Sequence, residues 1–109
     1  MNITKDDVIN EWVYCNYDVD DDSSITTFHL PEELIPNIIK YANDFIDNPK
    51  IVDQTELKIF SELSENDKKS VSICRGISKY VAFYNHSLDL VVDSVYDNID
   101  KIFRRNRKL

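Results

Sequence analysis

The sequence predicts a mostly α-helical fold, with four to five helices around a single core and at most one or two short strands. Apolar residues recur every three or four positions in several segments, as on one face of a helix. The 109 residues include one glycine, Gly76, and three prolines, Pro31, Pro36 and Pro49. So few glycines and prolines cannot supply the turns of an all-β sandwich or barrel. The length fits one domain, covering residues 1–109.

The first predicted helix spans about residues 5 to 16. Thr4 is its predicted N-cap, and Asp7 places a carboxylate in the first turn, close to the positive end of the helix dipole. Three apolar residues of this segment are spaced at i, i+4 and i+7, which puts them on one face. They are Val8, Trp12 and Cys15. We expect this face to pack into the core.

An acidic, solvated loop is predicted over residues 18–24, where four of the first five positions are aspartates. Asp18, Asp20 and Asp22 have the spacing of the first three calcium ligands of an EF-hand. The glycine and the glutamate that such a loop needs at its sixth and twelfth positions are missing, so no calcium site is predicted. The next segment, SITTFHL at residues 24–30, is rich in β-branched and aromatic residues and predicts a short strand.

The second predicted helix begins at Leu30-Pro31-Glu32-Glu33. Pro31 needs no N–H in a first helical turn, and the two glutamates favour the positive end of the dipole. Pro36 is expected to tighten or tilt the early turns. The helix is predicted to end at Asp47-Asn48-Pro49, because the residue before a proline avoids the α region. Its expected buried stripe consists of Leu34, Ile38, Tyr41, Ala42 and Phe45.

Two helices are predicted in the middle of the chain. The first covers residues 55 to 63, with Leu57, Phe60 and Leu63 directed inward. Ser64, followed by Asp67, predicts the cap of the next helix, over about residues 65 to 85. The stripe expected to be buried in that helix consists of Val71, Cys74, Ile77, Val81 and Tyr84. Gly76 lies inside it at a cost of about 1 kcal/mol relative to alanine, which suggests a close helix crossing.

The last predicted helix is capped by Ser87 and has the most regular apolar pattern of the chain. Its seam is spaced four, three, four, three, and Val91 and Phe103 widen it. The seam consists of Leu88, Val92, Val95, Ile99 and Ile102. Leu90 and Tyr96 adjoin the seam and are expected to stay near the surface, beside the acids Asp89, Asp93, Asp97 and Asp100. An exposed apolar strip among acids is typical of a partner-binding helix.

The net charge of -7 is unevenly distributed. A basic tail at residues 101–109 holds five basic residues, so residues 1–100 combine eight basic with twenty acidic residues and carry -12. Residues 1–100 are therefore expected to repel nucleic acid and to suit a protein partner with a basic or mixed surface. A homodimer is the alternative. The tail is expected to complement a helix C-terminal dipole. The predicted partner-binding residues are Asp18, Asp20, Asp21, Asp22, Leu90, Asp93, Tyr96 and Asp97.

No catalytic, cofactor-binding or metal-binding residue is predicted. The candidate nucleophile–base pairs are Cys74 with His86 and Cys15 with His29, but Cys74 lies on an apolar stripe, where cysteine behaves as a small hydrophobe. Two histidines and two cysteines that are far apart in sequence do not form a zinc pattern. The N-terminus has no apolar signal core and no apolar run approaches the ~20 residues of a membrane span, so a reduced, cytoplasmic protein is expected.

The order of these features resembles the centre of Skp1 and elongin C, proteins of the BTB/POZ type. The matching residues are Asp20-Asp21-Asp22, Leu30-Pro31, Ile38-Ile39-Lys40-Tyr41-Ala42 and Asp47-Asn48-Pro49. Residues 81–99 are similar to the late helix pair of that family, and the resemblance covers about two-thirds of the chain. The β-hairpin with which the BTB fold begins has no counterpart here, so the resemblance is to a truncated module. It implies an adaptor that binds its partner through residues 88–103.

The predicted function is therefore non-enzymatic protein binding, as an adaptor or mimic of the Skp1/BTB type. The alternative is an acidic inhibitor, an immunity or antitoxin-like protein that masks a basic toxin or nuclease site. The abundance of Asn, Asp, Ile and Lys fits an AT-rich genome, such as that of a virus, a phage or a low-GC bacterium.

Overall fold

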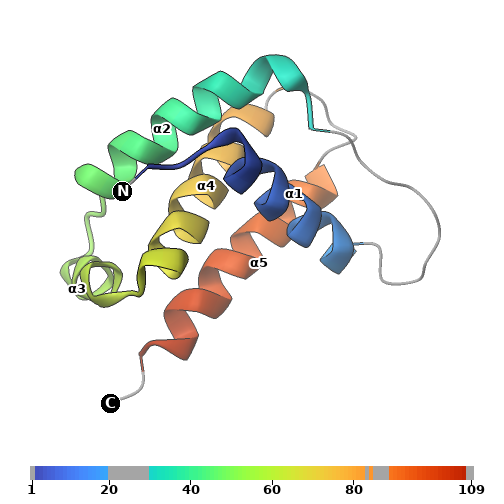
Figure 1. The fold of residues 1–109 in the computed structure, drawn as a ribbon. Helices are drawn as coiled ribbons and strands as arrows, with labels where there is room; N and C mark the ends of the chain where they lie inside the picture. Colours follow the sequence, from blue (N-terminus) through green and yellow to red (C-terminus); the bar gives the residue numbers. More distant parts are fainter. Residues whose placement is uncertain (1, 20–29, 83, 85–88, 108–109) are drawn as a thin grey trace.

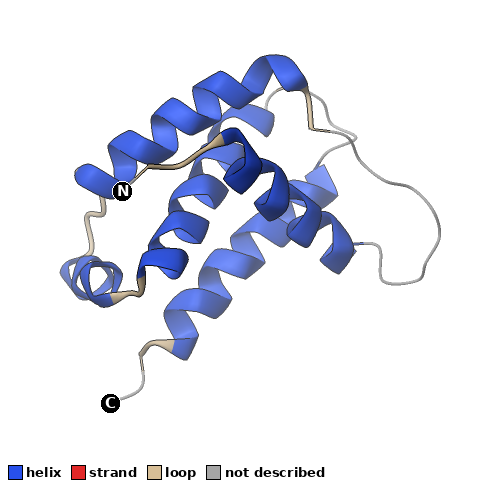
Figure 2. Ribbon diagram, viewed as in Figure 1, coloured by secondary structure: helices blue, strands red, loops and turns tan. Residues whose placement is uncertain are grey.

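The structure is a computed structural model that describes residues 2–19, 30–82, 84 and 89–107. These residues form helices and loops without a strand, so the predicted mostly α fold is confirmed (Figure 2). The strand expected at residues 24–30 lies, except for Leu30, outside the described residues. The elements are α1 (Lys5–Val19), the 3₁₀ turn η1 (Glu32–Leu34), α2 (Ile35–Asp47), α3 (Gln54–Glu62), α4 (Glu65–Val81) and α5 (Asp89–Arg105). In this described part, no helix combines the length and the apolar composition of a membrane span.

Helix α4 lies at the centre of the bundle, with α2 along one side and α5 along the other (Figure 1). Helix α1 packs across this group and contacts all three helices, whereas α3 lies at one end, close to α5. The main core is formed by the inner faces of α1, α2, α4 and α5. A second cluster around Phe45, Phe60 and Phe103 fills the end near α3, and Ile99 packs against both clusters.

Helices α2 and α4 approach closely where Gly76 faces Ile38 and Tyr41. A Cβ atom added at Gly76 would lie 3.3 Å from Ile38 Cγ2, from the Ile38 carbonyl oxygen and from Tyr41 Cδ1. The carbonyl oxygen can move only with the backbone of α2, so the glycine sets the distance between the two helices. The close crossing expected from this single glycine is confirmed.

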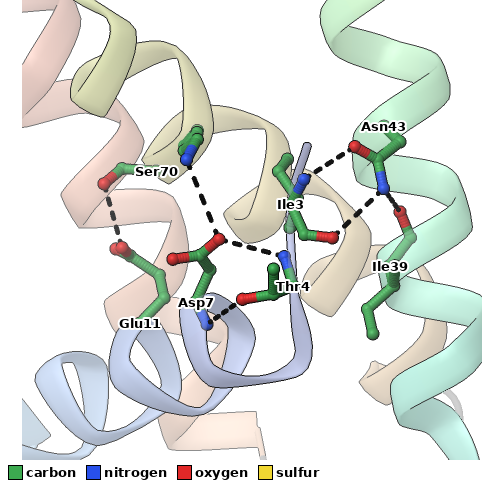
Figure 3. Close-up of polar contacts among 8 residues, drawn as sticks. Ile3, Thr4, Asp7, Glu11, Ile39, Asn43 and Ser70 are labelled. Carbon is green, nitrogen blue, oxygen red and sulfur yellow. Dashed lines mark hydrogen bonds and ion pairs between the residues drawn. The ribbon is translucent and has the colours of Figure 1, made fainter. Parts of the chain in front are cut away.

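The predicted helix starts are confirmed at two places. Ser64 accepts a hydrogen bond from the Asp67 N–H at the start of α4. At the start of α1, the Asp7 N–H donates to Thr4 Oγ1 and the Thr4 N–H donates to Asp7 Oδ2, a reciprocal capping box (Figure 3). The cap of α3 is Asp53, whose side chain accepts from the Glu56 N–H.

The predicted start of the second helix is wrong by several residues. Pro31 does not open an α-helix; it precedes the η1 turn, and α2 begins at Ile35 with Pro36 in its first turn. An α-helix through this segment would need a hydrogen bond from residue 36 to the Glu32 carbonyl, and proline has no N–H. The tighter 3₁₀ turn instead uses the N–H groups of Leu34 and Ile35.

The predicted core stripes are largely confirmed. In α2, Ile38, Ala42 and Phe45 are buried, while Leu34, in η1, and Tyr41 are only partly buried. The buried members of the other expected stripes are Val8, Trp12, Cys15, Phe60, Leu63, Val71, Cys74, Ile77, Val81, Val91, Val92, Val95, Ile102 and Phe103. Leu57 and Ile99 are partly buried, whereas Ser87 and Leu88 lie outside the described residues.

The predicted burial of Tyr84 is wrong, because 47% of its surface is exposed. Helix α4 ends at Val81, before the predicted end at residue 85. Tyr84 therefore continues the apolar spacing of the sequence but is not part of the helix. The tyrosine hydroxyl instead donates a hydrogen bond of 2.7 Å to Glu33 Oε2.

Replacing Gly76 by valine is expected to lower the free energy of unfolding by about 1–3 kcal/mol, since the added methyl groups would push α2 away from α4. Lys79→Val, at an exposed position of the same helix, is the matched control and should change stability by less than about 1 kcal/mol. Urea unfolding followed by circular dichroism measures both. Equal effects of the two substitutions would show that the close crossing is not required.

The neighbouring residues Val95 and Tyr96 should respond in opposite ways to aspartate. Val95 is fully buried and Tyr96 is 56% exposed. Val95→Asp is expected to cost about 4 kcal/mol or more, because it places an unpaired charge in the core. Tyr96→Asp should leave a cooperative thermal transition close to that of the unmodified protein. If circular dichroism showed both variants unfolded, the outer face of α5 would not be a free surface.

Candidate functional site

The most unusual feature of the interior is the carboxylate of Glu11, which lies on the side of α1 that faces α4 and α5. Ser70 Oγ donates to Glu11 Oε1 over 2.9 Å (Figure 3), and Asn98 Nδ2 donates to Oε2 over 2.7 Å. The Cys74 thiol donates to the same Oε2 over 3.5 Å. One side chain of α1 is thus bonded to two residues of α4 and one of α5.

The position of α1 follows from contacts at its N-terminus. The Ile3 N–H donates to Asn43 Oδ1 over 2.9 Å, and Asn43 Nδ2 donates back to the Ile3 carbonyl over 3.3 Å (Figure 3). Asp7 also lies 3.9 Å from Lys69 of α4, which adds an ion pair to its capping role. These contacts hold the first turn of α1 against α2 and α4, and Glu11 is one turn further along.

The two cysteines of the chain lie beside Glu11. Cys15 and Cys74 are free thiols without measurable exposure, although 59 positions separate them in the sequence. Their Sγ atoms and a carboxylate oxygen of Glu11 all lie within 4.8 Å of one another. Asn98 Nδ2 is 3.5 Å from Cys74 Sγ, so the amide contacts both the carboxylate and a thiol.

Burial changes the acid–base properties of this cluster. Removal from water raises the pKa of Glu11, and the hydrogen bonds from Ser70, Cys74 and Asn98 offset part of this rise. The pKa of Cys74 is raised well above its ordinary value, by its hydrogen bond with Cys15, by burial and by the Glu11 charge. The Cys74 thiol therefore stays protonated at neutral pH and is a poor nucleophile.

The sequence analysis missed Glu11, Ser70 and Asn98. A signal was present for two of them, because Glu11 and Asn98 lie on the inner faces of their helices. Glu11 follows Val8 by three positions and precedes Cys15 by four, and Asn98 follows Val95 by three. A polar residue on an otherwise apolar stripe predicts a buried hydrogen-bonded group.

Three of the predicted partner-binding residues lie together on the outer face of α5. Asp93, Tyr96 and Asp97 are all exposed. The side chains of Asp18 and Leu90 are not among those that the structure describes, and Asp20, Asp21, Asp22, His29 and His86 lie outside the described residues altogether. Helix α1 continues to Val19, so Asp18 is in its last turn and not in a loop as predicted.

Helix α1 also exposes apolar side chains that were not predicted. The exposed fractions are 36% for Ile9, 56% for Val13 and 52% for Tyr14. These side chains lie outside the buried face formed by Val8, Trp12 and Cys15, so the apolar residues of α1 are not confined to one side of the helix. A surface helix usually has only one apolar face. The exposed apolar side chains of α1 are therefore a second candidate binding surface, besides the outer side of α5.

The basic tail makes ion pairs with acids of the same chain. Arg104 pairs with Asp100 one turn earlier in α5, Arg105 with Asp67 of α4 at 3.0 Å, and Arg107 with Glu56 of α3 at 3.6 Å. Arg104 and Arg105 also lie in the last turn of α5, where positive charge complements the helix dipole as expected. The tail thus binds Asp100, Asp67 and Glu56, whereas Asp93 and Asp97 on the outer side of α5 form no ion pair with any residue that the structure describes.

An open pocket of about 600 Å³ lies beside α2 and α4. Lys79 is 5.4 Å from the centre of the Tyr41 ring, which lines this pocket, and Lys40 pairs with Asp44 at 3.1 Å. Three lysines and two aspartates line it, so its charge is nearly balanced. Its described lining includes no cysteine, serine, threonine or histidine.

The stability of the protein should depend on pH through Glu11. Its folded pKa is raised, so the native state holds this proton more tightly than the unfolded chain. Protonation of Glu11 therefore stabilises the native state fully at pH values below the pKa of the unfolded chain, about 4.3. This stabilisation is lost as pH rises through the pKa of the folded protein. Relative to Glu11→Gln, the unmodified protein should gain unfolding free energy as pH falls from 7 towards 4.

Urea titrations at several pH values test this expectation, with the exposed Glu62→Gln as the matched control. Glu62→Gln removes the same charge without affecting the cluster, so its stability should follow that of the unmodified protein across this range. The expectation fails if Glu11→Gln also shows the same pH dependence as the unmodified protein.

Comparison with known proteins identified no relative of this chain: no protein-family model, no curated protein and no solved structure matches it. The resemblance to Skp1 and elongin C stays a prediction from the sequence.

Proposed function

We propose that this protein is a non-enzymatic interaction module that binds a basic protein surface through the outer face of α5. We define this outer face as Asp93, Tyr96, Asp97 and Asp100. The observation that carries the proposal is the exposure of an aromatic side chain, 56% for Tyr96, within a group of exposed aspartates.

The geometry of the outer face follows from helix periodicity. Residues three and four positions apart are neighbours on a helix surface, so Tyr96 lies between Asp93 and Asp100. Asp93 and Asp97 form no ion pair with any residue that the structure describes, whereas Asp100 pairs with Arg104. Two carboxylates of this face are therefore available to an incoming cation.

The residue types on the outer face fit a protein partner. A tyrosine combines a large apolar ring with a hydroxyl group, and tyrosines are frequent among residues that dominate binding energy. Carboxylates around it select a complementary basic surface and accelerate encounter. The charge of -12 on residues 1–100 acts in the same direction over a longer range.

The same charges disfavour a homodimer through this face. A two-fold axis would place the aspartates of one copy opposite the aspartates of the other. Like charges across an interface cost binding energy, so the proposed partner is a different protein.

The interior cluster supports binding over catalysis. Cys74 is protonated and fully buried, and its neighbour Cys15 is also without exposure. A substrate could reach neither thiol without displacing α1. The chemistry-bearing side chains of the described residues therefore lie apart from the exposed face.

The proposed partner class is a basic toxin or nuclease, with this protein as its acidic inhibitor. The acids on the outer face of α5 favour this class, because an inhibitor of such an enzyme must cover a cationic site. The adaptor of the Skp1/BTB type stays a prediction, because the strand expected at residues 24–30 lies, except for Leu30, outside the described residues. That resemblance also implies binding through residues 88–103, so both classes make α5 the helix to test.

Affinity capture from the native host, quantified by mass spectrometry, tests the proposed face. Tyr96→Ala should reduce capture of a basic protein more than tenfold, since loss of a central aromatic anchor costs about 2 kcal/mol or more. Asp93→Asn combined with Asp97→Asn should weaken capture most at low salt, where electrostatic attraction is strongest. The captured protein is then purified and its affinity for each variant measured directly.

Tyr14→Ala is the matched control, because Tyr14 on α1 is exposed to a similar extent, 52%. It should capture the same proteins as the unmodified chain. Loss of capture with Tyr14→Ala and full capture with Tyr96→Ala would move the binding surface to α1 and overturn the proposal.

A further inference from the structure

We propose that Glu11, Cys15 and Cys74 form a binding site for a thiophilic divalent metal ion of the Zn²⁺ class. The observation is that one carboxylate oxygen and two sulfur atoms, from α1 and α4, lie within 4.8 Å of one another. This juxtaposition is not detectable in the sequence, where the cysteines are 59 positions apart.

The distances are close to those of a tetrahedral site. With metal–sulfur bonds of about 2.3 Å, neighbouring ligand atoms of a tetrahedron lie roughly 3.8 Å apart. The three atoms, at most 4.8 Å apart, need to close by no more than about 1 Å around an ion. Rotation of the Glu11 side chain and small shifts of the two cysteines supply this movement without a change of fold.

The ligand types select the ion. Thiolates favour Zn²⁺ and Cu(I) over the hard cations Mg²⁺ and Ca²⁺, and a carboxylate is an accepted additional ligand of zinc. Glu11 and Cys15 are four positions apart on one face of α1, so both reach the same point. With three protein ligands, the fourth position of the tetrahedron is left for a water molecule. Glu11 is the only ligand residue of the three that is not fully buried.

The surrounding side chains are placed to orient these ligands. Ser70 donates to Glu11 Oε1, which leaves Oε2 turned towards Cys74. Asn98 Nδ2 donates to Oε2 over 2.7 Å and contacts Cys74 Sγ at 3.5 Å. Hydrogen bonds of this kind fix the orientation of metal ligands and stabilise their negative charge.

Binding exchanges protons for the ion. The Cys15 and Cys74 thiols each lose a proton to solvent, and two metal–sulfur bonds form. Two thiolates and one carboxylate then face a doubly positive ion, leaving one net negative charge beside the Asn98 amide. Apparent affinity must therefore rise with pH.

Cobalt(II) is the probe, because its bonds to thiolate produce charge-transfer absorption in the near ultraviolet. The full chain is freed of metal, both cysteines are shown to be reduced by thiol titration, and Co²⁺ is added. The chain has two cysteines in all, so any such absorption is assigned to them. We expect saturable absorption at one ion per chain, displacement by Zn²⁺, and tighter binding at pH 8 than at pH 6.

Cys15→Ala and Cys74→Ala should each remove about half or more of the absorption, and Glu11→Gln should weaken binding about tenfold or more. Glu11→Gln keeps a hydrogen-bonding side chain, so it remains informative if a cysteine variant does not fold. Glu62→Gln, at an exposed position, should bind as the unmodified protein does. The proposal is overturned if the fully reduced chain gives no absorption, or if Glu11→Gln and Glu62→Gln bind equally.

Discussion

The buried carboxylate of Glu11 is the constraint on which the arrangement of the helices depends. A partly buried charge needs hydrogen-bond donors, and the placement of α1 brings Glu11 to Ser70, Cys74 and Asn98 together. A rotation of α1 by one residue would turn Glu11 by about 100° and leave these donors unpaired. Apolar packing alone tolerates such shifts better, whereas a polar network of this kind specifies one register.

That register decides what lies inside and what lies outside. It brings Cys15 to Cys74 in the interior and leaves Ile9, Val13 and Tyr14 exposed elsewhere on the surface of α1. Gly76 sets the approach of α2 to the other side of α4. With both flanks of α4 fixed, the apolar seam of α5 faces the core, and Asp93, Asp97 and Asp100 face solvent. The interior cluster and the proposed partner face are therefore separate consequences of the same packing.

Local signals in the sequence predicted much of this fold, because caps and apolar periodicity act within one or two turns. Ser64 and the seam through Val95 illustrate both signals. Helix ends were less predictable: Tyr84 continues the period of α4 but lies beyond its last turn. The η1 turn before α2 forms because Pro36 has no N–H group to donate to the preceding turn. The periodicity of apolar residues carries no information about this backbone hydrogen bonding.

The candidate sites divide in the same way. Tyr96, Asp93 and Asp97 were predictable because exposure on a helix follows from its apolar seam. The Glu11 cluster was not, since its members come from three helices and meet only through tertiary packing. A cysteine on an apolar stripe has the same pattern whether or not a second cysteine packs against it. Spacing along the chain therefore gave no sign of a shared site.

The placement of α1 depends most directly on the environment of the Glu11 carboxylate. Carbon-13 NMR of the side-chain carboxyl groups in the metal-free protein, recorded from pH 3 to pH 8, measures that environment residue by residue. The packing described here predicts that Glu11 titrates above the ordinary pKa of a glutamate carboxyl group, because burial raises its pKa. Titration of Glu11 at that ordinary value would contradict the packing, since the carboxylate would then be in water and α1 would not be held as described.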